Sequence, residues 1–407
     1  MRILQVNKFN YIRGGAEKYF IDLSKKLEIE GHQVAIFCMH HPKNNPSPWD
    51  KYFVSRISFN EKKLRDRLLA PGRILYSFEA RRKFKKIIKD FKPDIIHVHN
   101  IYHQLSPSIL PIAKKFKIPV VMHLHDYKLI CPNYQLFTHD KICYRCKGQK
   151  YYNCLRFSCF KKSFWQSLLA TIEMYFHHSI LNIYKKNIDC FIAPSQFMKE
   201  TVVSFGIPGE KVFLVYNFSE ESLVKEINKG KEDDYGLYFG RLSGEKGIDV
   251  LLNSLSFVKN KINIKIVGAG PEEKNLKDLS SQLNLEDSVD FVGPKFGSEL
   301  FDIVSKAKMI FLPSVWAENM PLVLLESLSL GKIVIASKTG GLSELIEDKK
   351  SGFLFENGNY KDLSEVIGSV DDYDLNKIKS KAKEISDKLN INSHLEKILN
   401  IYKKYVK

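Results

Sequence analysis

The sequence contains no long apolar segment, because no run of about 18 uncharged apolar residues occurs anywhere in the chain. A membrane-spanning helix is therefore not expected. The opening residues MRILQVNKFN pass directly into a strand-like pattern and lack the apolar region of a signal peptide. We expect a cytoplasmic protein that is soluble or held at the periphery of the inner face of the cell membrane.

Acidic residues are scarce in the first half of the chain. Residues 1–220 hold 36 Lys and Arg against 17 Asp and Glu, whereas residues 221–407 hold 27 against 29. The net charge of +17 therefore comes from the first half alone. This asymmetry indicates an anionic partner there, such as a membrane surface, a lipid phosphate or a nucleic acid. The alternative is a solvated Lys-rich surface without a specific partner.

Short apolar runs alternate with helical segments along the whole chain, and a length of 407 residues suits two domains with full-sized cores. Nearly continuous apolar runs between helices predict parallel sheets covered on both faces. The predicted strands are 2–6, 33–37, 94–98, 119–124, 189–193 and 212–216, then 235–240, 262–268, 289–293, 309–313, 332–336 and 352–355.

The predicted fold class is α/β, with two doubly wound Rossmann-like domains. The first domain covers residues 1–217 and carries a Cys-rich insertion at about 131–160, and the second covers residues 218–390. The last amphipathic stretch, 391–407, is compatible with packing on either domain, including a return to the first one. Ligands of open parallel sheets bind beyond the carboxyl ends of the strands, so we expect a cleft between the two sheets.

Two loops of the first half carry candidate functional residues. Gly14 and Gly15 separate the first strand from a helix that begins near Ala16, an arrangement that exposes helix N-terminal amides to an anion. The alternative is a tight turn without a ligand. His125 and Asp126 follow the strand at 119–124, where an imidazole can share a proton with a polar substrate or serve a structural role.

The second half places cations and small residues in corresponding loops. Arg241 and Lys246 lie in a Gly-containing loop that leads into a helix, which suits a diphosphate. Gly268 and Gly270 follow the next strand and allow close backbone approach, and the FVG motif at 291–293 ends another strand.

A fourth loop combines two glutamates with a helix start. Glu318 precedes a helix predicted from Pro321 to Leu330, and Glu326 lies within that helix. We expect Glu326 to be buried between aliphatic side chains, where a carboxylate needs hydrogen-bond donors. A ribose diol offers two donors side by side, and the alternative is a pair with Lys or Arg of a neighbouring helix. A rise of 1.5 Å per residue separates the two glutamates by about 12 Å.

Together these stretches resemble the retaining family 4 glycosyltransferases, which have the GT-B fold. The resemblance rests on RGGAE (13–17), HDY (125–127), FGRLSGEKG (239–247), GAGP (268–271), FVG (291–293), the spacing from Glu318 to Glu326, and GG at 340–341. The motifs occur in the family's order and cover essentially the whole chain. As an ordered set they are far more specific than any one of them.

The resemblance implies transfer of a hexosyl or N-acetylhexosaminyl group from a UDP- or GDP-type nucleotide diphosphate sugar to a saccharide acceptor, with retention of configuration. Implied catalytic residues are Glu318, His125, Lys246 and Arg241. Implied donor-binding residues are Gly14, Gly15, Arg241, Lys246, Gly268, Gly270, Val292, Lys295, Glu318, Asn319, Met320, Pro321, Leu322 and Glu326.

By analogy, Glu326 would hold the ribose, and Arg241 and Lys246 the diphosphate. Glu318 would contact hydroxyls of the donor sugar, with His125 on the other side of that sugar. The relevant loops contain no Asp-x-Asp metal clamp, so we expect no cofactor or metal in catalysis. Two carboxylates this far apart also do not suit a double displacement, which needs a separation of roughly 5 Å.

Five of the seven cysteines lie between residues 131 and 159. Because disulfides are disfavoured in the cytoplasm, this spacing indicates a structural zinc with Cys131, Cys143, Cys146 and Cys159 as ligands and Cys154 spare. The alternative is a set of reduced thiols in a packed loop.

The aromatic stretch 164–186, together with the basic stretch 81–92, is compatible with contact to an anionic bilayer, which would make the acceptor a lipid-linked saccharide. A plain core helix is the alternative. The resulting hypothesis is a glycosyltransferase of cell-surface polysaccharide (capsule or lipopolysaccharide) biosynthesis that does not bind nucleic acid. Rival hypotheses are a sugar nucleotide epimerase or a glycogen- or sucrose-type transferase of the same fold, and a zinc-bearing nucleic-acid-binding protein.

Overall fold

The computed structural model describes residues 1–57, 71–218 and 232–406. Contacts within the chain separate two compact units, which are treated individually below. The N-terminal unit comprises Met1–Thr138, Cys143–Val215 and His394–Lys407, and the C-terminal unit comprises His139–Ile142 and Tyr216–Ser393. The border after Val215 lies close to the expected end of the first domain at residue 217.

The N-terminal unit is built on a six-stranded parallel sheet with the order β2-β1-β3-β4-β7-β8. Its central strands bury every residue, as expected for near-continuous apolar runs in a sheet covered on both faces. The strands are β1 (Arg2–Val6), β2 (Gln33–Phe37), β3 (Ile95–Val98), β4 (Val120–His123), β7 (Cys190–Ala193) and β8 (Val212–Leu214).

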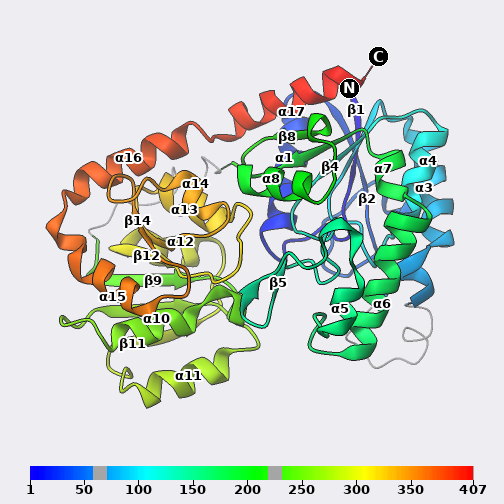
Figure 1. The fold of residues 1–407 in the computed structure, drawn as a ribbon. Helices are drawn as coiled ribbons and strands as arrows, with labels where there is room; N and C mark the ends of the chain where they lie inside the picture. The colour runs from blue at the N-terminus through cyan, green and yellow to red at the C-terminus, as the bar shows by residue number, and fades with distance from the viewer. Residues whose placement is uncertain (58–70, 219–231, 407) are drawn as a thin grey trace. The chain divides into compact units, whose positions relative to one another are not determined.

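Helices connect these strands and cover both faces of the sheet (Figure 1). They are α1 (Gly15–Ile29), α3 (Phe78–Phe91), α4 (Leu110–Lys115), α7 (Ile183–Asn187) and α8 (Gln196–Ser204). The amphipathic helix α3 buries Phe84, Ile87 and Ile88 toward the sheet, while its Lys85 and Lys86 are exposed.

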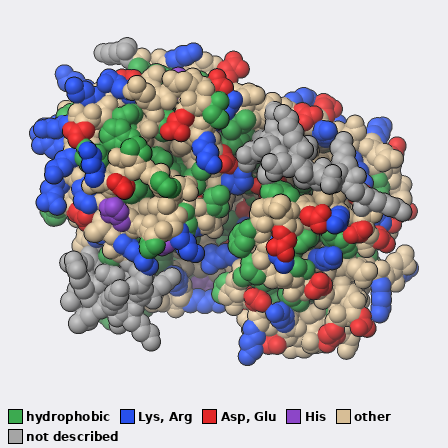
Figure 2. Space-filling view, turned by 180° about the vertical axis from the view of Figure 1, so that it is seen from behind, with side chains coloured by type: hydrophobic (Ala, Val, Ile, Leu, Met, Phe, Trp, Pro, Cys, Tyr) green, Lys and Arg blue, Asp and Glu red, His purple; other side chains and the backbone are tan. Residues whose placement is uncertain are grey.

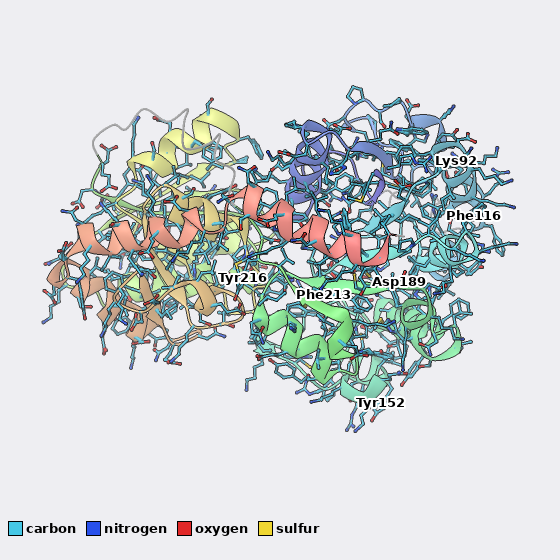
Figure 3. The ribbon with its side chains drawn as sticks, turned by 90° about the horizontal axis from the view of Figure 1, so that it is seen from above. Lys92, Phe116, Tyr152, Asp189, Phe213 and Tyr216 are labelled. Carbon is cyan, nitrogen blue, oxygen red and sulfur yellow. The ribbon has the colours of Figure 1, made fainter. Side chains whose placement is uncertain are left out.

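The last helix, α17 (Ile391–Tyr405), returns to the N-terminal unit. It buries Leu395, Ile398 and Tyr402, and the ammonium of Lys404 lies 4.9 Å from the ring centroid of Phe213 on β8. Figure 3 shows this helix beside the labelled Phe213. The end of the chain therefore completes a fold that began more than 300 residues earlier.

The insertion after β4 consists of short elements and two longer helical segments. The short elements are β5 (Phe137–Thr138), β6 (Lys141–Ile142) and α5 (Tyr152–Arg156), followed by α6 (Phe164–Met174) and a π-helical segment, Tyr175–Ile180. Among the residues that the structure describes, no helix is both long and apolar enough to cross a bilayer.

The C-terminal unit repeats the plan with a six-stranded parallel sheet of order β11-β10-β9-β12-β13-β14. The strands are β9 (Tyr235–Phe239), β10 (Asn263–Val267), β11 (Val289–Gly293), β12 (Met309–Leu312), β13 (Ile333–Ser337) and β14 (Phe353–Phe355). The helices are α10 (Ile248–Leu255), α11 (Glu273–Gln282), α12 (Gly297–Lys306), α13 (Leu322–Ser329), α14 (Leu342–Leu345), α15 (Tyr360–Ser369) and α16 (Leu375–Asp387).

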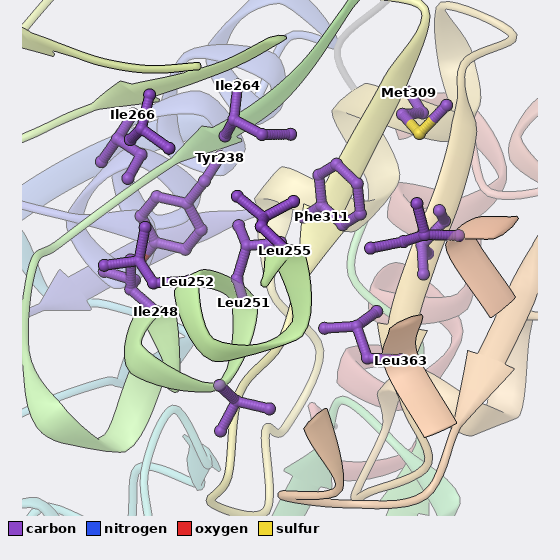
Figure 4. Close-up of a cluster of buried hydrophobic side chains, with 14 of the residues drawn as sticks. Tyr238, Ile248, Leu251, Leu252, Leu255, Ile264, Ile266, Met309, Phe311 and Leu363 are labelled. Atoms are coloured by element: carbon purple, nitrogen blue, oxygen red, sulfur yellow. The ribbon is translucent and has the colours of Figure 1, made fainter. Parts of the chain in front are cut away.

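Two apolar cores lie on opposite faces of this second sheet. One packs Phe311 and Ile264 against Leu251 and Leu255 of α10, as Figure 4 shows. The other packs Ile310 against Leu324 and Leu328 of α13. Because consecutive residues of β12 serve opposite cores, the strand is apolar along its whole length.

The predicted α/β fold with two parallel sheets is confirmed. Each of the twelve predicted strands coincides with an observed strand, to within a residue or two at each end. The paired strands β5 and β6 were not predicted, since elements of two residues carry no periodic pattern.

Candidate functional site

Functional residues of the C-terminal unit meet in an ion pair between Lys246 and Glu318. Lys246 ends the short 3-10 helix Gly244–Lys246 after β9, and Glu318 lies between β12 and α13. Lys246 Nζ donates to Glu318 Oε1 at 2.6 Å, and Ser314 Oγ donates to the same oxygen at 2.7 Å. Glu318 is only 6% exposed, whereas the Lys246 side chain is 23% exposed. The ammonium can therefore still meet a ligand.

Glu318 remains ionised although it is buried. Burial alone would raise its pKa, but the charge of Lys246 and the hydrogen bonds from Lys246 and Ser314 outweigh burial and lower the pKa below its ordinary value. The pair thus places a fixed cation beside a fixed carboxylate. Lys246 also lies 5.4 Å from the ring centroid of Trp316, which further restricts the ammonium.

The loops that carry the pair are held together by backbone contacts. Gly247 has a φ of +64°, and a Cβ there would lie 2.0 Å from the carbonyl oxygen of Pro313. The amide of Val315 donates to the carbonyl of Glu245 at 3.0 Å. Only glycine at position 247 permits this approach, so the glycine of the EKG motif fixes the Lys246 loop against the Glu318 loop.

The GG motif at 340–341 supports Glu318 from the other side. Gly340 has a φ of +52°, and a Cβ there would lie 2.2 Å from the carbonyl oxygen of Glu318. The amide of Gly341 donates to that oxygen at 2.7 Å. The two glycines therefore fix the backbone of Glu318.

Arg241 lies in the same loop as Lys246, and its side chain is exposed. Its carbonyl accepts from Tyr238 Oη at 2.8 Å, and the amide of Leu242 donates to Ala269 at 3.1 Å. The GAGP turn packs directly on this loop, because a Cβ at Gly268 would lie 1.8 Å from the carbonyl oxygen of Gly240. The structure therefore brings together the loop of Arg241 and Lys246 and the GAGP turn, as predicted.

The N-terminus of α13 lies directly after Glu318. Pro321 flanks the helix without a side-chain cap, and its carbonyl accepts from the Leu324 amide at 3.1 Å, so only the amides before Leu324 can meet a ligand or water. Asn319 and Met320 are buried, Leu322 is the first helical residue, and Asn217 Nδ2 donates to the Met320 carbonyl at 3.0 Å. An anion at this end would also meet the positive pole of the helix.

The predicted burial of Glu326 is wrong. Glu326 is half-buried, and it shares the more open face of α13 with the partly exposed Leu322, Val323 and Leu330, while Leu324, Leu325 and Leu328 face the core. The sequence misled because aliphatic residues cover both faces of this helix. Glu326 therefore needs no buried donor, and a ribose would approach it from the open face.

The residues predicted near the base, Val292 and Lys295, lie at the end of β11 and in the loop after it. Both are half-buried. Lys295 forms an ion pair with Glu299 in the first turn of α12. This partner was not predicted.

In the N-terminal unit, Gly14 and Gly15 are exposed at the start of α1. Glu17, which the RGGAE motif contains but to which no role was given, is 6% exposed. Burial raises its pKa, while the charges of Lys8 and Arg13 act in the opposite direction. Glu17 and Lys8 therefore belong to the surroundings of this helix start, and the acid at the third helical position was the available signal.

His125 and Asp126 follow β4 and are half-buried. His125 Nε2 lies 2.9 Å from His99 Nδ1, and Asp126 Oδ1 accepts from the Lys128 amide at 2.9 Å. Burial, assisted by the charge of Lys8, lowers the pKa of His125 to about 3. His125 is therefore neutral at physiological pH.

A buried ion pair fixes the loop after His125, and sequence reasoning missed it. Lys128 Nζ donates to Glu173 Oε2 at 2.7 Å and to the Pro132 carbonyl at 3.2 Å, with the side chains of Lys128 and Glu173 each 2% exposed. Glu173 lies on α6 and is the only acid between residues 164 and 186. A single acid in such an apolar stretch was the signal that could have indicated a buried partner.

Burial and the nearby thiols of Cys131, Cys143 and Cys159 raise the pKa of Cys146, so the predicted zinc ligands lie near one another, and zinc binding stays a prediction. Cys131 Sγ donates to Asn133 Oδ1 at 2.9 Å, whereas Cys143 Sγ accepts from Arg145 at 4.0 Å. The thiols of Cys154 and Cys159 are hydrogen bonded to each other, and Cys146 packs with Tyr151 and Met174. Within residues 1–57, 71–218 and 232–406, no group of three or more His, Cys, Asp or Glu side chains is arranged to hold a metal ion.

Two protein-family models match consecutive parts of the chain. Residues 13–221 match the model described as Glycosyltransferase Family 4, and residues 219–400 match the model described as Glycosyl transferases group 1. The first match alone covers just over half of the chain, and its end coincides with the border between the two units.

Two relatives are about a quarter identical in sequence to this chain over most of its length. An uncharacterized 42.6 kDa protein in the cps region of Klebsiella pneumoniae is 26% identical over 85% of this chain and 87% of its own length. The alpha-monoglucosyldiacylglycerol synthase of Streptococcus pneumoniae is 25% identical over 82% of this chain and 70% of its own. The crystal structure of Anabaena Alr3699/HepE in complex with UDP-glucose has a TM-score of 0.67 and 19% identity, over 99% of this chain and 100% of that one.

The close packing of the GAGP turn predicts that Gly270→Ala destabilises the C-terminal unit. A Cβ there would lie 2.0 Å from the carbonyl oxygen of Leu242, so the two backbones would have to separate. We expect a loss of about 2 kcal/mol or more in the free energy of unfolding, measured by urea denaturation. Gly244→Ala is the control, because a Cβ at Gly244 meets nothing within 4 Å. Equal stability of the two variants would contradict the packing.

The buried histidines predict acid sensitivity. Burial, with smaller effects of neighbouring groups, lowers the pKa of His97 and His125 to about 3 and those of His99 and His123 well below the ordinary value. Below a pH of about 6.5 the unfolded chain therefore binds more protons than the folded one, and each such group removes up to about 1.4 kcal/mol of stability per pH unit.

We expect urea denaturation to show a falling free energy of unfolding as the pH decreases from 7 to 5. The variant His123→Phe removes one buried imidazole whose two ring nitrogens have no hydrogen-bond partner among the described residues. Its pH dependence should be shallower by about 1.4 kcal/mol per unit. A wild-type stability that does not change over this range would refute the burial of neutral imidazoles.

Proposed function

Because this chain belongs to Glycosyltransferase Family 4, we propose that it moves a sugar from a UDP- or GDP-type nucleotide diphosphate sugar to a saccharide acceptor with retention of configuration. The Lys246–Glu318 ion pair beside the N-terminus of α13 carries this proposal. Departure of a nucleoside diphosphate develops negative charge on its terminal phosphate. Lys246, Arg241 and the amides of α13 are groups that stabilise such charge.

Glu318 has two tasks in this scheme. Its carboxylate fixes the ammonium of Lys246, which would otherwise sample many positions on a flexible stem. It also presents an ionised acceptor where hydroxyls of the donor sugar are expected, next to the phosphate. On the N-terminal unit, we propose that His125 exchanges a hydrogen bond with a substrate hydroxyl and that Gly14 and Gly15 allow close approach of a substrate to α1.

The donor class is supported by proteins that share the fold. Anabaena Alr3699/HepE is described in complexes with UDP and with UDP-glucose, and it resembles this chain over almost its whole length. In the present chain the exposed Arg241 and the open face of α13 around Glu326 are available to a diphosphate and a ribose. We propose that the transferred group is a hexosyl or N-acetylhexosaminyl group.

We further propose a lipid-linked saccharide as the acceptor and surface polysaccharide synthesis as the context. Relatives include a protein in a cps region and a synthase that is named for a glucosylated diacylglycerol. A basic surface on the N-terminal unit supports this proposal. Figure 2 shows Lys and Arg side chains gathered on that unit. Lys85 and Lys86 of α3 are exposed.

Helix α6 contributes the apolar part of this membrane surface. It buries Ser167, Ala170 and Glu173 but exposes Trp165 by 75% and Phe164 by 53%. Lys161 and Lys162 precede them and are also exposed. Exposed aromatic residues beside lysines suit the interface of an anionic bilayer, where the rings insert and the cations meet phosphates.

Lys246→Met tests the leaving-group role. Loss of the fixed cation should lower kcat/KM by about 100- to 1000-fold. Glu318→Gln should lower kcat by a similar factor and leave nucleotide affinity mostly intact, because the phosphate contacts remain. The measurement is release of nucleoside diphosphate from a panel of UDP- and GDP-sugars with membrane extract as acceptor, and Kd from calorimetry.

Lys259→Met and Glu286→Gln serve as matched controls, since both residues are exposed in the same unit. Full turnover in Lys246→Met would refute the proposed role of the ion pair. Interconversion of donors without any acceptor would indicate an epimerase instead of a transferase.

Replacement of Phe164 and Trp165 by Ser tests the membrane surface. We expect sedimentation with phosphatidylglycerol-containing vesicles to weaken about tenfold or more, because two interfacial aromatic rings are lost. Phe296→Ser removes a side chain of the C-terminal unit that is 79% exposed and should bind like the wild type. Unchanged vesicle binding by the α6 variant would rule out this surface.

A further inference from the structure

Four imidazoles lie together on one face of the N-terminal sheet. His97 lies on β3 and His99 follows two residues later, just after the strand ends. His123 and His125 have the same spacing at the end of β4. Because side chains two residues apart point to the same side of a strand, all four lie on one face. His97, His99 and His123 are fully buried. The ring of His125 lies 4.5 Å from that of His123 and 5.2 Å from that of His99, centroid to centroid.

Hydrogen bonds link Gln5 and two of these imidazoles, those of His99 and His125, in a chain. Gln5 on β1 directs Oε1 to His99 Nε2 at 2.8 Å, and His99 Nδ1 lies 2.9 Å from His125 Nε2. A neutral imidazole has one donating and one accepting nitrogen. Because an amide oxygen only accepts, His99 carries its proton on Nε2 and accepts at Nδ1. His125 must then donate from Nε2, which leaves Nδ1 as its accepting nitrogen.

We propose that Gln5 and His99 are positioning residues that fix the orientation and the tautomer of His125, so that His125 accepts a hydrogen bond from a substrate hydroxyl through Nδ1. This inference rests on the proposed function, in which His125 contacts the sugar. It assigns to the buried pair a role that packing does not require, since apolar residues would fill the same space without the cost of burying polar groups.

The neighbours of this chain hold it rigid. The ring centroids of Tyr19 and His125 lie 5.2 Å apart in an edge-to-face arrangement. Tyr19 Oη lies 2.7 Å from His394 Nε2. Tyr402 Oη lies 2.7 Å from His97 Nδ1. His394 and Tyr402 both belong to α17, so the last helix packs against this cluster. These contacts restrict the movement of the His125 ring.

Gln5→Met tests the chain, because it preserves the shape of the side chain and removes the accepting oxygen. Without that oxygen His99 is free to adopt either tautomer, and so is His125. We expect kcat to fall about 10- to 100-fold with the KM for the donor changed little, by analogy with partners that orient catalytic and metal-bound histidines. Gln5→Glu restores an acceptor at the same place and should recover part of the lost kcat.

A spectroscopic signature separates positioning from mere packing. In the full-length protein labelled with ¹⁵N-histidine, the His125 signal is assigned by its absence from His125→Asn. The wild type should show a proton on Nε2 and none on Nδ1, and Gln5→Met should show a mixture of tautomers. Ser24→Ala is the control: it removes a buried hydroxyl of α1 that donates to the Phe20 carbonyl, outside the chain to His125, so stability should fall while tautomer and kcat stay unchanged.

The outcomes distinguish this inference from the proposed function. If the wild type transfers sugar but His125 is protonated on Nδ1, or if Gln5→Met retains full kcat, the positioning roles are refuted and the transferase function stands. If the wild type transfers no sugar from any donor, the proposed function fails, whatever the tautomer measured. A Ser24→Ala variant that loses kcat as strongly as Gln5→Met would also overturn the inference, because general loosening of the N-terminal unit would then explain both.

Discussion

The ion pair between Lys246 and Glu318 is the interaction on which the proposed chemistry depends. A carboxylate that is 6% exposed stays charged only because Lys246 and Ser314 satisfy one of its oxygens. In return, the carboxylate fixes the ammonium near the amides at the start of α13. A cation and helix dipole that are already oriented stabilise a leaving diphosphate without reorganisation at the moment of reaction. Gly247 and Gly340 permit the backbone approaches that hold the two loops at this separation.

The N-terminal unit supplies the opposite kind of group, an imidazole that is kept neutral. Burial lowers the pKa of His125 to about 3, so in our proposal this residue contributes a directed hydrogen bond and not a mobile proton. The direction of that bond depends on which nitrogen carries the proton, and we propose that the chain through His99 to Gln5 decides this. The fixed charges of one unit and the fixed tautomer of the other are then two forms of preorganisation.

The sequence predicted the strands and the loop positions of the functional residues because both follow from local patterns: apolar runs for buried parallel strands, and glycines or cations directly after them. Partnerships across the chain left no such local signal. Lys246 and Glu318 are 72 residues apart, and His97 meets Tyr402 over 305 residues. The burial of Glu326 was misjudged because α13 is aliphatic on both faces. The cysteines lie near one another as their close spacing along the chain suggests, and their binding of zinc stays a prediction.

A crystal structure of the protein with UDP or GDP, whichever binds more tightly, tests the central claim most directly. The account predicts a terminal phosphate oxygen within hydrogen-bond distance of Lys246 Nζ and of the first amides of α13, with Glu318 still bonded to the ammonium. A nucleotide bound elsewhere, or a phosphate held by other residues while Lys246 faces only Glu318, would contradict it.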